Sequence, residues 1–498
     1  MSQSRLTSVF VRAMAWNYVS GIVLLLAQLA YTAVTARHIP ARDFGAYAVG
    51  LTLLQVLNYF GGSTFGNAVM RAPELGPQVA TTAMLLSVAA GSVISLVLVV
   101  LAEPAETLLH APGLTQVLYL LALMPPMTGV SAVASGLLRR EDRYRSAAVI
   151  ALISSIIGFL VGGFLAVQGE GVVALVLAQV VCAWFGGVVA TFAVRRRLSR
   201  SLSARGVRQL LPFSAQVSGQ NLLHYVVEAL PVWVVTRSYG VTVTGYFTRS
   251  MQLVYLPTYQ LLTAIQRSLY PLYQRLREPG RRRAALTDVL VLTSGGAAVF
   301  YGIGAACGEP LALLLLGPAW SESARLVPAF CAAYAASTVY GVTSSAAEAL
   351  GWMSVIWRVQ VMFILTTVVG LVIAAGHDVS AVVLVMFLAP ASAHALMVST
   401  RTFRESIDGA RVATAYAVHG AIAVSLYAAA SLAATIAAPS SHILDLAVRI
   451  GTVGCVLAVI WLLRAHVPAW VVAQRRWRGR VAGTATISGS EPDPAMAG

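Results

Sequence analysis

The sequence predicts an all-α membrane protein with about fourteen transmembrane helices. Hydrophobic residues make up 58% of its 498 residues and charged residues only 11%, whereas a soluble domain carries about 25% charged residues. The apolar runs are continuous and close to the roughly 20 residues that a helix needs to cross a bilayer. Strands are not expected, because apolar and polar residues do not alternate along these runs.

The predicted spans form a front group of six and a back group of eight. The front group lies at residues 14–36, 44–66, 79–102, 114–136, 146–167 and 171–194. The first span is too long for the apolar core of a signal peptide, so we expect it to be retained. After a basic linker at residues 195–209, the back group lies at residues 210–236, 242–265, 286–307, 325–350, 355–375, 379–400, 412–436 and 443–463.

The placement of arginine predicts the orientation of the chain. Arginine provides all 34 basic residues, and the formal net charge is +15. With a cytoplasmic N-terminus, 28 arginines fall in cytoplasmic segments, and five lie outside or at outer helix ends: Arg37, Arg42, Arg237, Arg325 and Arg449. The positive-inside rule therefore predicts that both termini are cytoplasmic. Contact of the clusters with anionic lipid or a phosphorylated head group is the alternative interpretation, and nucleic acid is not an expected partner.

No sequence motif indicates catalysis, a metal or a cofactor. The phosphate-binding pattern GxxxxGK[ST], the zinc pattern HExxH and the nucleophile pattern GxSxG do not occur. The four cysteines are scattered, and the eight histidines do not cluster in sequence at metal-ligand spacing. We therefore expect a non-enzyme without a metal or cofactor.

A polar stripe on the seventh predicted span is the first candidate functional feature. Gln216, Gln220, His224 and Glu228 recur every fourth residue, and Asn221 lies beside them. Successive members of such a series are rotated by about 40°, so they share one side of a helix. Ionisable groups inside a membrane are costly and indicate function. Glu228 is thus the candidate for ion coupling, with H⁺ or Na⁺ as the ion.

Arg249, on the eighth predicted span, is the candidate for binding an anionic cargo. A buried structural ion pair between Glu228 and Arg249 is the alternative interpretation. The remaining candidates for the lining of a polar cavity lie on the first helices of each half: Asn17, Gln28, Arg37, Asn58 and Gln252. For each amide alone, a hydrogen bond between helices is the alternative.

A faint internal repeat relates the two halves. An offset of 200 residues superposes Arg37 on Arg237 and Gly45 on Gly245, and both windows follow the first helix of a half. Parallel repeats of this kind are common in transporters. Gly158 and Gly162, spaced by four, are expected to allow close helix packing.

Three segments in the same order resemble bacterial polysaccharide flippases of the Wzx type. They read ARHIPARDFGAYAVGLTLLQVL, GLLRREDRYRSAAVIALISSIIGFLVG and GYFTRSMQLVYLPTYQLLTAIQRSLYPLYQRLR, and PLALLLLGPAWSESARLVPAF follows them. Within the Wzx type they are similar to the branch for exopolysaccharide and teichuronic acid export. In this family a basic residue usually stands where Arg249 lies, within a Tyr-x-x-Arg-like motif that here reads Phe247-Thr248-Arg249. Arg37 likewise matches the basic residue that ends the family's first helix.

The resemblance implies the fold of the multidrug/oligosaccharidyl-lipid/polysaccharide superfamily. Residues 1–194 are then a six-helix lobe, 195–209 a cytoplasmic linker, 210–400 a second six-helix lobe, 401–463 two additional helices and 464–498 a cytoplasmic tail. It also implies the transfer of a polyprenyl-pyrophosphate-linked oligosaccharide across the bacterial inner membrane, beside membrane lipids and a polysaccharide polymerase and export machinery. The alternatives are a multidrug and toxic compound extrusion antiporter and, less favoured because the outer linkers are short, a glycan polymerase or ligase.

Overall fold

The structure is a computed structural model that describes residues 3–58, 62–71, 76–199, 201–203, 207, 225–275 and 278–474. Helices are the regular secondary structure of these residues, and no strand occurs among them. The all-α class predicted from the continuous apolar runs is therefore confirmed.

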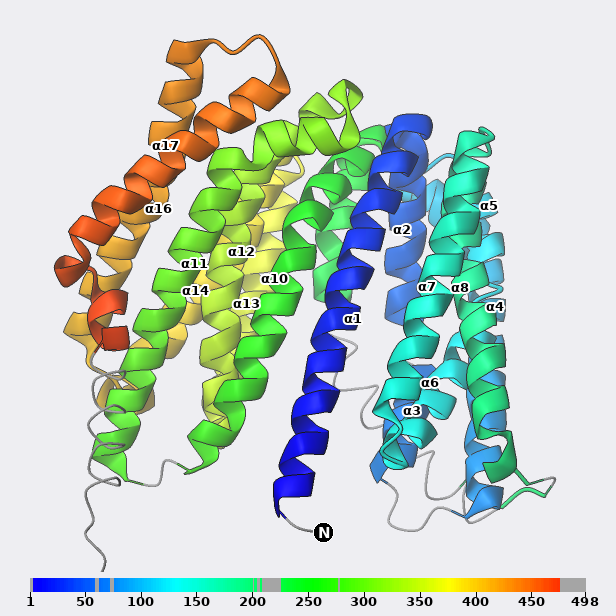
Figure 1. The fold of residues 1–498 in the computed structure, drawn as a ribbon. Helices are drawn as coiled ribbons and strands as arrows, with labels where there is room; N and C mark the ends of the chain where they lie inside the picture. Colours follow the sequence, from blue (N-terminus) through cyan, green and yellow to red (C-terminus); the bar gives the residue numbers. More distant parts are fainter. Residues whose placement is uncertain are drawn as a thin grey trace, which may run out of the picture. The chain divides into compact units, whose positions relative to one another are not determined.

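The described helices belong to two compact units (Figure 1). The first unit comprises Met1–Arg249, Leu315–Ser323 and Leu371–Val382. Its helices are α1 (Gln3–His38), α2 (Ala41–Asn58), α3 (Gly62–Arg71), α4 (Pro77–Leu109), α5 (Leu114–Leu121), α6 (Pro125–Arg140), α7 (Tyr144–Val167), α8 (Gly171–Val194), a helix over residues 225–239 and the start of α10 (Val241–Arg275).

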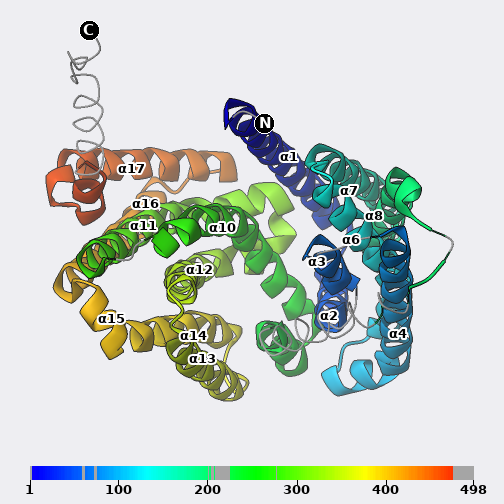
Figure 2. The ribbon, with the colours of Figure 1, turned by 90° about the horizontal axis from the view of Figure 1, so that it is seen from below.

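The second unit comprises Ser250–Leu314, Ala324–Gly370 and Val383–Gly498. It holds the rest of α10 and all or most of each helix that follows. These helices are α11 (Pro279–Leu316), α12 (Ser321–Ala349), α13 (Met353–Ala374), α14 (Val379–Ser399), α15 (Arg401–Ser406), α16 (Gly409–Ala437) and α17 (His442–Leu462). Seen from below in Figure 2, α16 and α17 lie side by side, in agreement with their packing contacts.

Most of the predicted spans coincide with a single described helix, whereas the span predicted at residues 44–66 covers parts of both α2 and α3. Nine helices of the described residues are long and apolar enough to cross a membrane, and α5 with α6 forms a tenth span if the two count as one. The span predicted at residues 114–136 consists of two helices, α5 and α6, which are bent by 40°. Pro125 and Pro126 begin α6, and a proline disfavours helical continuation from the preceding residue. The total of fourteen spans stays a prediction.

Small residues bring α7 and α8 into close contact. A Cβ atom added at Gly158 would collide with the carbonyl oxygen of Ala178, and one at Gly162 would lie 2.5 Å from the Ala178 Cβ. Two helix backbones can approach this closely only where the residue at the contact has no side chain. The predicted packing role of the Gly158–Gly162 spacing is thus confirmed.

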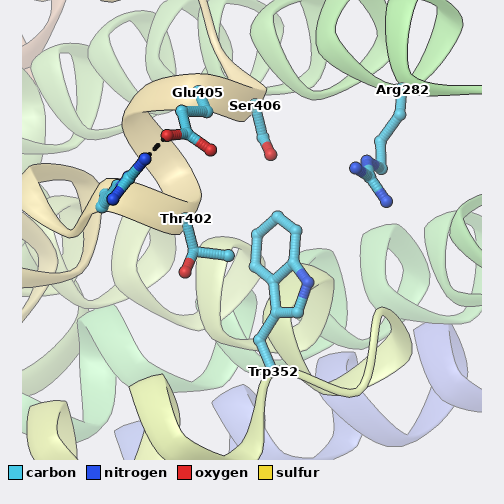
Figure 3. Close-up of a pocket in the computed structure, with 6 residues that line it drawn as sticks. Arg282, Trp352, Thr402, Glu405 and Ser406 are labelled. Carbon is cyan, nitrogen blue, oxygen red and sulfur yellow. Dashed lines mark hydrogen bonds and ion pairs between the residues drawn. The ribbon is translucent and has the colours of Figure 1, made fainter.

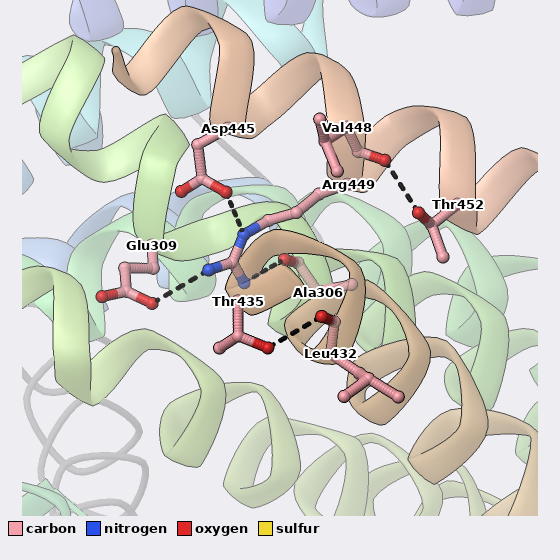
Figure 4. A network of polar contacts seen from close by, with 8 residues as sticks. All are labelled: Ala306, Glu309, Leu432, Thr435, Asp445, Val448, Arg449 and Thr452. Carbon is pink, nitrogen blue, oxygen red and sulfur yellow. Dashed lines mark hydrogen bonds and ion pairs between the residues drawn. The ribbon is translucent and has the colours of Figure 1, made fainter. Parts of the chain in front are cut away.

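An ionic network around the buried Arg449 side chain joins α17 to α11 in the second unit (Figure 4). The Arg449 Nε donates to Asp445 at 2.8 Å, and its Nη2 lies 3.5 Å from Glu309. Its Nη1 donates to the carbonyl oxygen of Ala306 at 3.1 Å. Pro310 lies inside α11 and has no N–H for that carbonyl four residues earlier. Arg449 therefore supplies the hydrogen bond that Pro310 removes.

We expect Arg449→Leu to destabilise the second unit by about 1–3 kcal/mol, because it leaves the buried carbonyl of Ala306 without its donor. The free energy of unfolding in mixed detergent micelles measures this effect. Arg358→Leu is the matched control, since Arg358 is exposed and donates to the carbonyl of Ser354 in its own helix. Equal stability of the two variants would contradict the role given to Arg449.

Candidate functional site

Arg249 is buried near the beginning of α10. It lies eight residues after Val241, about 12 Å along the helix at 1.5 Å per residue. Its side chain is 7% exposed, and its guanidinium carbon lies 3.7 Å from the centre of the Phe44 ring. A desolvated cation over an aromatic face gains about 2 kcal/mol or more. The ring of Phe44 therefore helps to hold a charge inside the first unit.

Two phenols and an amide complete the surroundings of this guanidinium. Tyr31 and Tyr47 both interact electrostatically with Arg249. The Tyr47 hydroxyl shares a hydrogen bond with Gln179, and the Tyr31 ring stacks on Phe159 at 4.9 Å. We name the group formed by Arg249, Phe44, Tyr31, Tyr47 and Gln179 the Arg249 cluster.

The Arg249 cluster is assembled from four separate helices of the first unit. Tyr31 comes from α1, Phe44 and Tyr47 from α2, Gln179 from α8 and Arg249 from α10. Phe44 also meets Trp320 edge to face at 5.2 Å. Such a group offers a fixed cation, hydroxyls and aromatic faces. Arginine binds phosphate oxygens through paired hydrogen bonds.

The sequence singled out Arg249 but missed the other four members of the cluster. Phe44 and Tyr47 are three residues apart and so share a helix face, but aromatic residues at this spacing usually pack in a core. Tyr31 and Gln179 carry no local signal. Their meeting with Arg249 depends on the packing of helices that are far apart in the sequence.

The other predicted lining residues have different environments. Arg37 is exposed at the end of α1, and Gln28, Asn58 and Gln252 are half-buried. Glu228, in the helix over residues 225–239, is exposed, whereas Arg249 is buried. The rest of the predicted stripe, Gln216, Gln220, Asn221 and His224, lies outside the described residues, and so does the side chain of Asn17.

The two glycines superposed by the 200-residue offset make one reciprocal contact. A Cβ atom added at Gly45 would collide with the carbonyl oxygen of Val241, and one added at Gly245 would collide with that of Ala41. The offset of 200 also relates Ala41 to Val241, so the contact is symmetric in sequence. The first turns of α2 and α10 thus touch through equivalent backbone atoms, which supports an internal repeat.

Two hydrogen bonds attach the segment Leu315–Ser323 to the helices that carry the Arg249 cluster. The Trp320 Nε1 donates to the carbonyl of Ala36 at 2.8 Å, and the Ser323 hydroxyl donates to that of Tyr246 at 2.8 Å. They fasten the segment Leu315–Ser323 to the end of α1 and to the first turns of α10. Within the described part of the chain, no three His, Cys, Asp or Glu side chains come together as metal ligands.

Comparison with known proteins gives the chain a family. The family described as "Polysaccharide biosynthesis protein" matches residues 34–325. The succinoglycan biosynthesis transport protein ExoT of Rhizobium meliloti is 27% identical over 313 residues, 62% of this chain and 63% of that protein. The lipopolysaccharide biosynthesis protein WzxC of Escherichia coli is 20% identical over 267 residues, 53% of this chain and 54% of that protein. The chain thus matches less than two thirds of each relative's length.

Solved structures give the fold. The lipid II flippase MurJ in an inward closed conformation superposes with a TM-score of 0.69 at 10% identity, over 91% of this chain and 99% of MurJ. An inward-facing multidrug resistance MATE family transporter of the MOP superfamily gives a TM-score of 0.57 at 14% identity, over 79% of this chain and 95% of the transporter. These likenesses confirm the predicted transporter fold of a multi-pass membrane protein. Because the family match covers more than half of the sequence, the chain belongs to the polysaccharide biosynthesis protein family.

Proposed function

We propose that this protein moves a lipid-linked oligosaccharide, carried on polyprenyl pyrophosphate, from the inner to the outer leaflet of the bacterial cytoplasmic membrane for the synthesis of a surface polysaccharide. The observation that carries the proposal is the buried guanidinium of Arg249, surrounded by Phe44, Tyr31 and Tyr47. The family match and the names of the two relatives support the same class of cargo.

The Arg249 cluster suits both polar parts of such a cargo. The pyrophosphate is anionic, and a guanidinium in low-dielectric surroundings binds phosphate oxygens strongly because it donates two hydrogen bonds at once. The sugars are rich in hydroxyls, for which the phenols of Tyr31 and Tyr47 and the amide of Gln179 offer donors and acceptors. The polyprenyl tail is apolar and can remain in the lipid during transfer.

The proposed mechanism is alternating access in two repeated six-helix lobes, residues 1–194 and 210–400. The linker 195–209, the added helices of residues 401–463 and the tail 464–498 complete this division. We place both termini in the cytoplasm, because that orientation puts most of the arginines there. Expected neighbours are the polymerase and export machinery that use the transferred oligosaccharide. A transporter of this kind needs no catalytic residue.

An ion-coupled antiporter for small cations is the second candidate function, and its support is the structural likeness to the MATE transporter. An organic cation would be repelled by the positive charge of Arg249. The Arg249 cluster therefore favours an anionic cargo. A polymerase or ligase is a third candidate and would act on units that are already in the outer leaflet.

Glu228 is our candidate for coupling to a proton or sodium gradient. Glu228→Gln removes the charge but keeps the shape, so we expect slower export under an imposed gradient and unchanged protein abundance. Glu103→Gln, on the exposed side of α4, is the matched control. Export by Glu228→Gln that responds to the gradient as the wild type does would remove Glu228 from the mechanism.

Deletion of the gene tests the proposed function. We expect loss of a surface polysaccharide together with build-up of complete lipid-linked oligosaccharide units, measured by mass spectrometry of lipid extracts. An undiminished surface polysaccharide and an unchanged lipid profile would overturn the proposal.

A further inference from the structure

A second polar site lies in the second unit, away from the Arg249 cluster in sequence. It is a pocket of about 350 Å³, within the size range of small-molecule sites. The pocket is lined by Arg282, Trp352, Arg401, Thr402, Glu405 and Ser406 (Figure 3). These residues come from the first turn of α11, the α12–α13 connection and α15. We name it the Arg282 pocket.

Arg282 is the residue of this pocket whose hydrogen bonding calls for an explanation. Among the described residues, its Nε is buried without a hydrogen-bond partner. A buried donor without a partner is unfavourable, because it has lost its hydrogen bonds to water without replacing them. Its guanidinium carbon lies 5.8 Å from the centre of the Trp352 ring, and Figure 3 shows the guanidinium and the Ser406 hydroxyl both directed toward that indole. An acceptor bound in the pocket would satisfy the guanidinium.

The charges around the pocket favour an anion. Arg282 and Arg401 contribute two positive charges, and the carboxylate of Glu405 accepts from the Arg401 Nε at 2.8 Å. The lining residues therefore carry a net positive charge of one. Arg283 adds a further positive charge nearby, and its Nε donates to the carbonyl of Ile407 at 3.2 Å.

The walls of the pocket are held in place by buried residues. Trp352 packs edge to face on Phe403 at 4.9 Å, and Phe403 is fully buried. In the sequence, Phe403 stands between the lining residues Thr402 and Glu405. Its side chain belongs to the apolar core of the second unit. The side chains of Trp352, Thr402 and Ser406 are thus attached to a packed scaffold, which lowers the entropy lost when a ligand binds.

We propose that the Arg282 pocket binds a phosphate group through Arg282, Thr402 and Ser406. Guanidinium and hydroxyl groups are the usual partners of phosphate oxygens. The pocket belongs to the helix ends where the arginine distribution predicts the cytoplasmic face, and anionic lipid head groups gather there. The phosphate can therefore come from an anionic phospholipid or from a soluble phosphate compound. The proposal does not depend on the cargo or on transport.

Binding to the purified full-length protein tests this site. The probes are phosphatidylglycerol in nanodiscs, with phosphatidylcholine nanodiscs as the reference, and inorganic phosphate and pyrophosphate added to protein in a neutral detergent. We expect Arg282→Gln and Thr402→Val each to weaken binding about tenfold or more, a change of about 1.4 kcal/mol, because each removes a charge-assisted hydrogen bond to the phosphate. Native mass spectrometry and thermal stabilisation measure the binding.

Arg281→Gln is the matched control, because the Arg281 side chain is 79% exposed and pairs with Glu278 instead of lining the pocket. Variant-sensitive binding of phosphatidylglycerol alone assigns a lipid head group, and variant-sensitive binding of the free anions assigns a soluble ligand. Both results support the site. Thr402→Val keeps the test valid if Arg282→Gln does not fold. The proposal is overturned if no probe binds, or if Arg281→Gln weakens binding as much as the pocket variants do.

Discussion

Arg249→Ala is expected to abolish export of the surface polysaccharide while the protein remains in the membrane. The change removes the buried cation over Phe44 and leaves the aromatic and phenolic groups in place. The anionic part of the cargo then has no guanidinium to receive it. Arg249→Lys should recover part of the export, because lysine keeps the charge but cannot donate two parallel hydrogen bonds.

Arg237→Ala is the matched control for this experiment. Arg237 is exposed and donates to His110 from the end of the preceding helix, so its loss should leave export intact. Surface polysaccharide is quantified per unit of membrane protein, which separates lost transport from lost folding. Wild-type export by Arg249→Ala at normal abundance would refute the role given to the Arg249 cluster.

Gly45→Leu and Gly245→Leu are expected to have the second largest effect. At each position a side chain would collide with a backbone carbonyl, which cannot swing away as a flexible side chain can. Overpacking of this kind costs about 1–3 kcal/mol or more. The first turns of α2 and α10 must therefore separate, and the Phe44 ring beside Gly45 must move relative to Arg249. We expect export to fall about tenfold or more, because the Phe44 ring then no longer holds the Arg249 guanidinium in position, a contact that contributes about 2 kcal/mol.

Two observations make this prediction specific. Gly420→Leu, in α16, is the matched control because a Cβ placed there would have open space around it among the described residues. The two glycines are equivalent in the reciprocal contact, so their variants should have similar effects. Full export by both variants would show that α2 and α10 do not need this contact.

The helices were largely predictable because hydropathy is a local property. The span predicted at residues 171–194 coincides with α8, and that predicted at 379–400 differs from α14 by one residue. A buried position for Arg249 also followed from its apolar neighbours. Each of these features depends on residues that are close in the sequence.

The composition of the site was less predictable because it depends on contacts between distant helices. Tyr31 and Gln179 are ordinary residues of apolar helices until packing brings them to Arg249. The Arg282 pocket was not predicted, because its arginines were fully explained by the positive-inside rule. The hydrogen bond from Arg449 to the Ala306 carbonyl, which Pro310 cannot satisfy, was not predicted. Arg449 and Ala306 are 143 residues apart in the sequence.

The most direct test of the central claim is the leaflet distribution of the lipid-linked oligosaccharide in a strain that lacks this gene. Mass spectrometry identifies the lipid, and a probe confined to the periplasm labels the units exposed in the outer leaflet. Our account predicts complete units trapped in the inner leaflet, released by the wild-type gene but not by Arg249→Ala. Accumulation in the outer leaflet would contradict it, because the protein would then act after transfer.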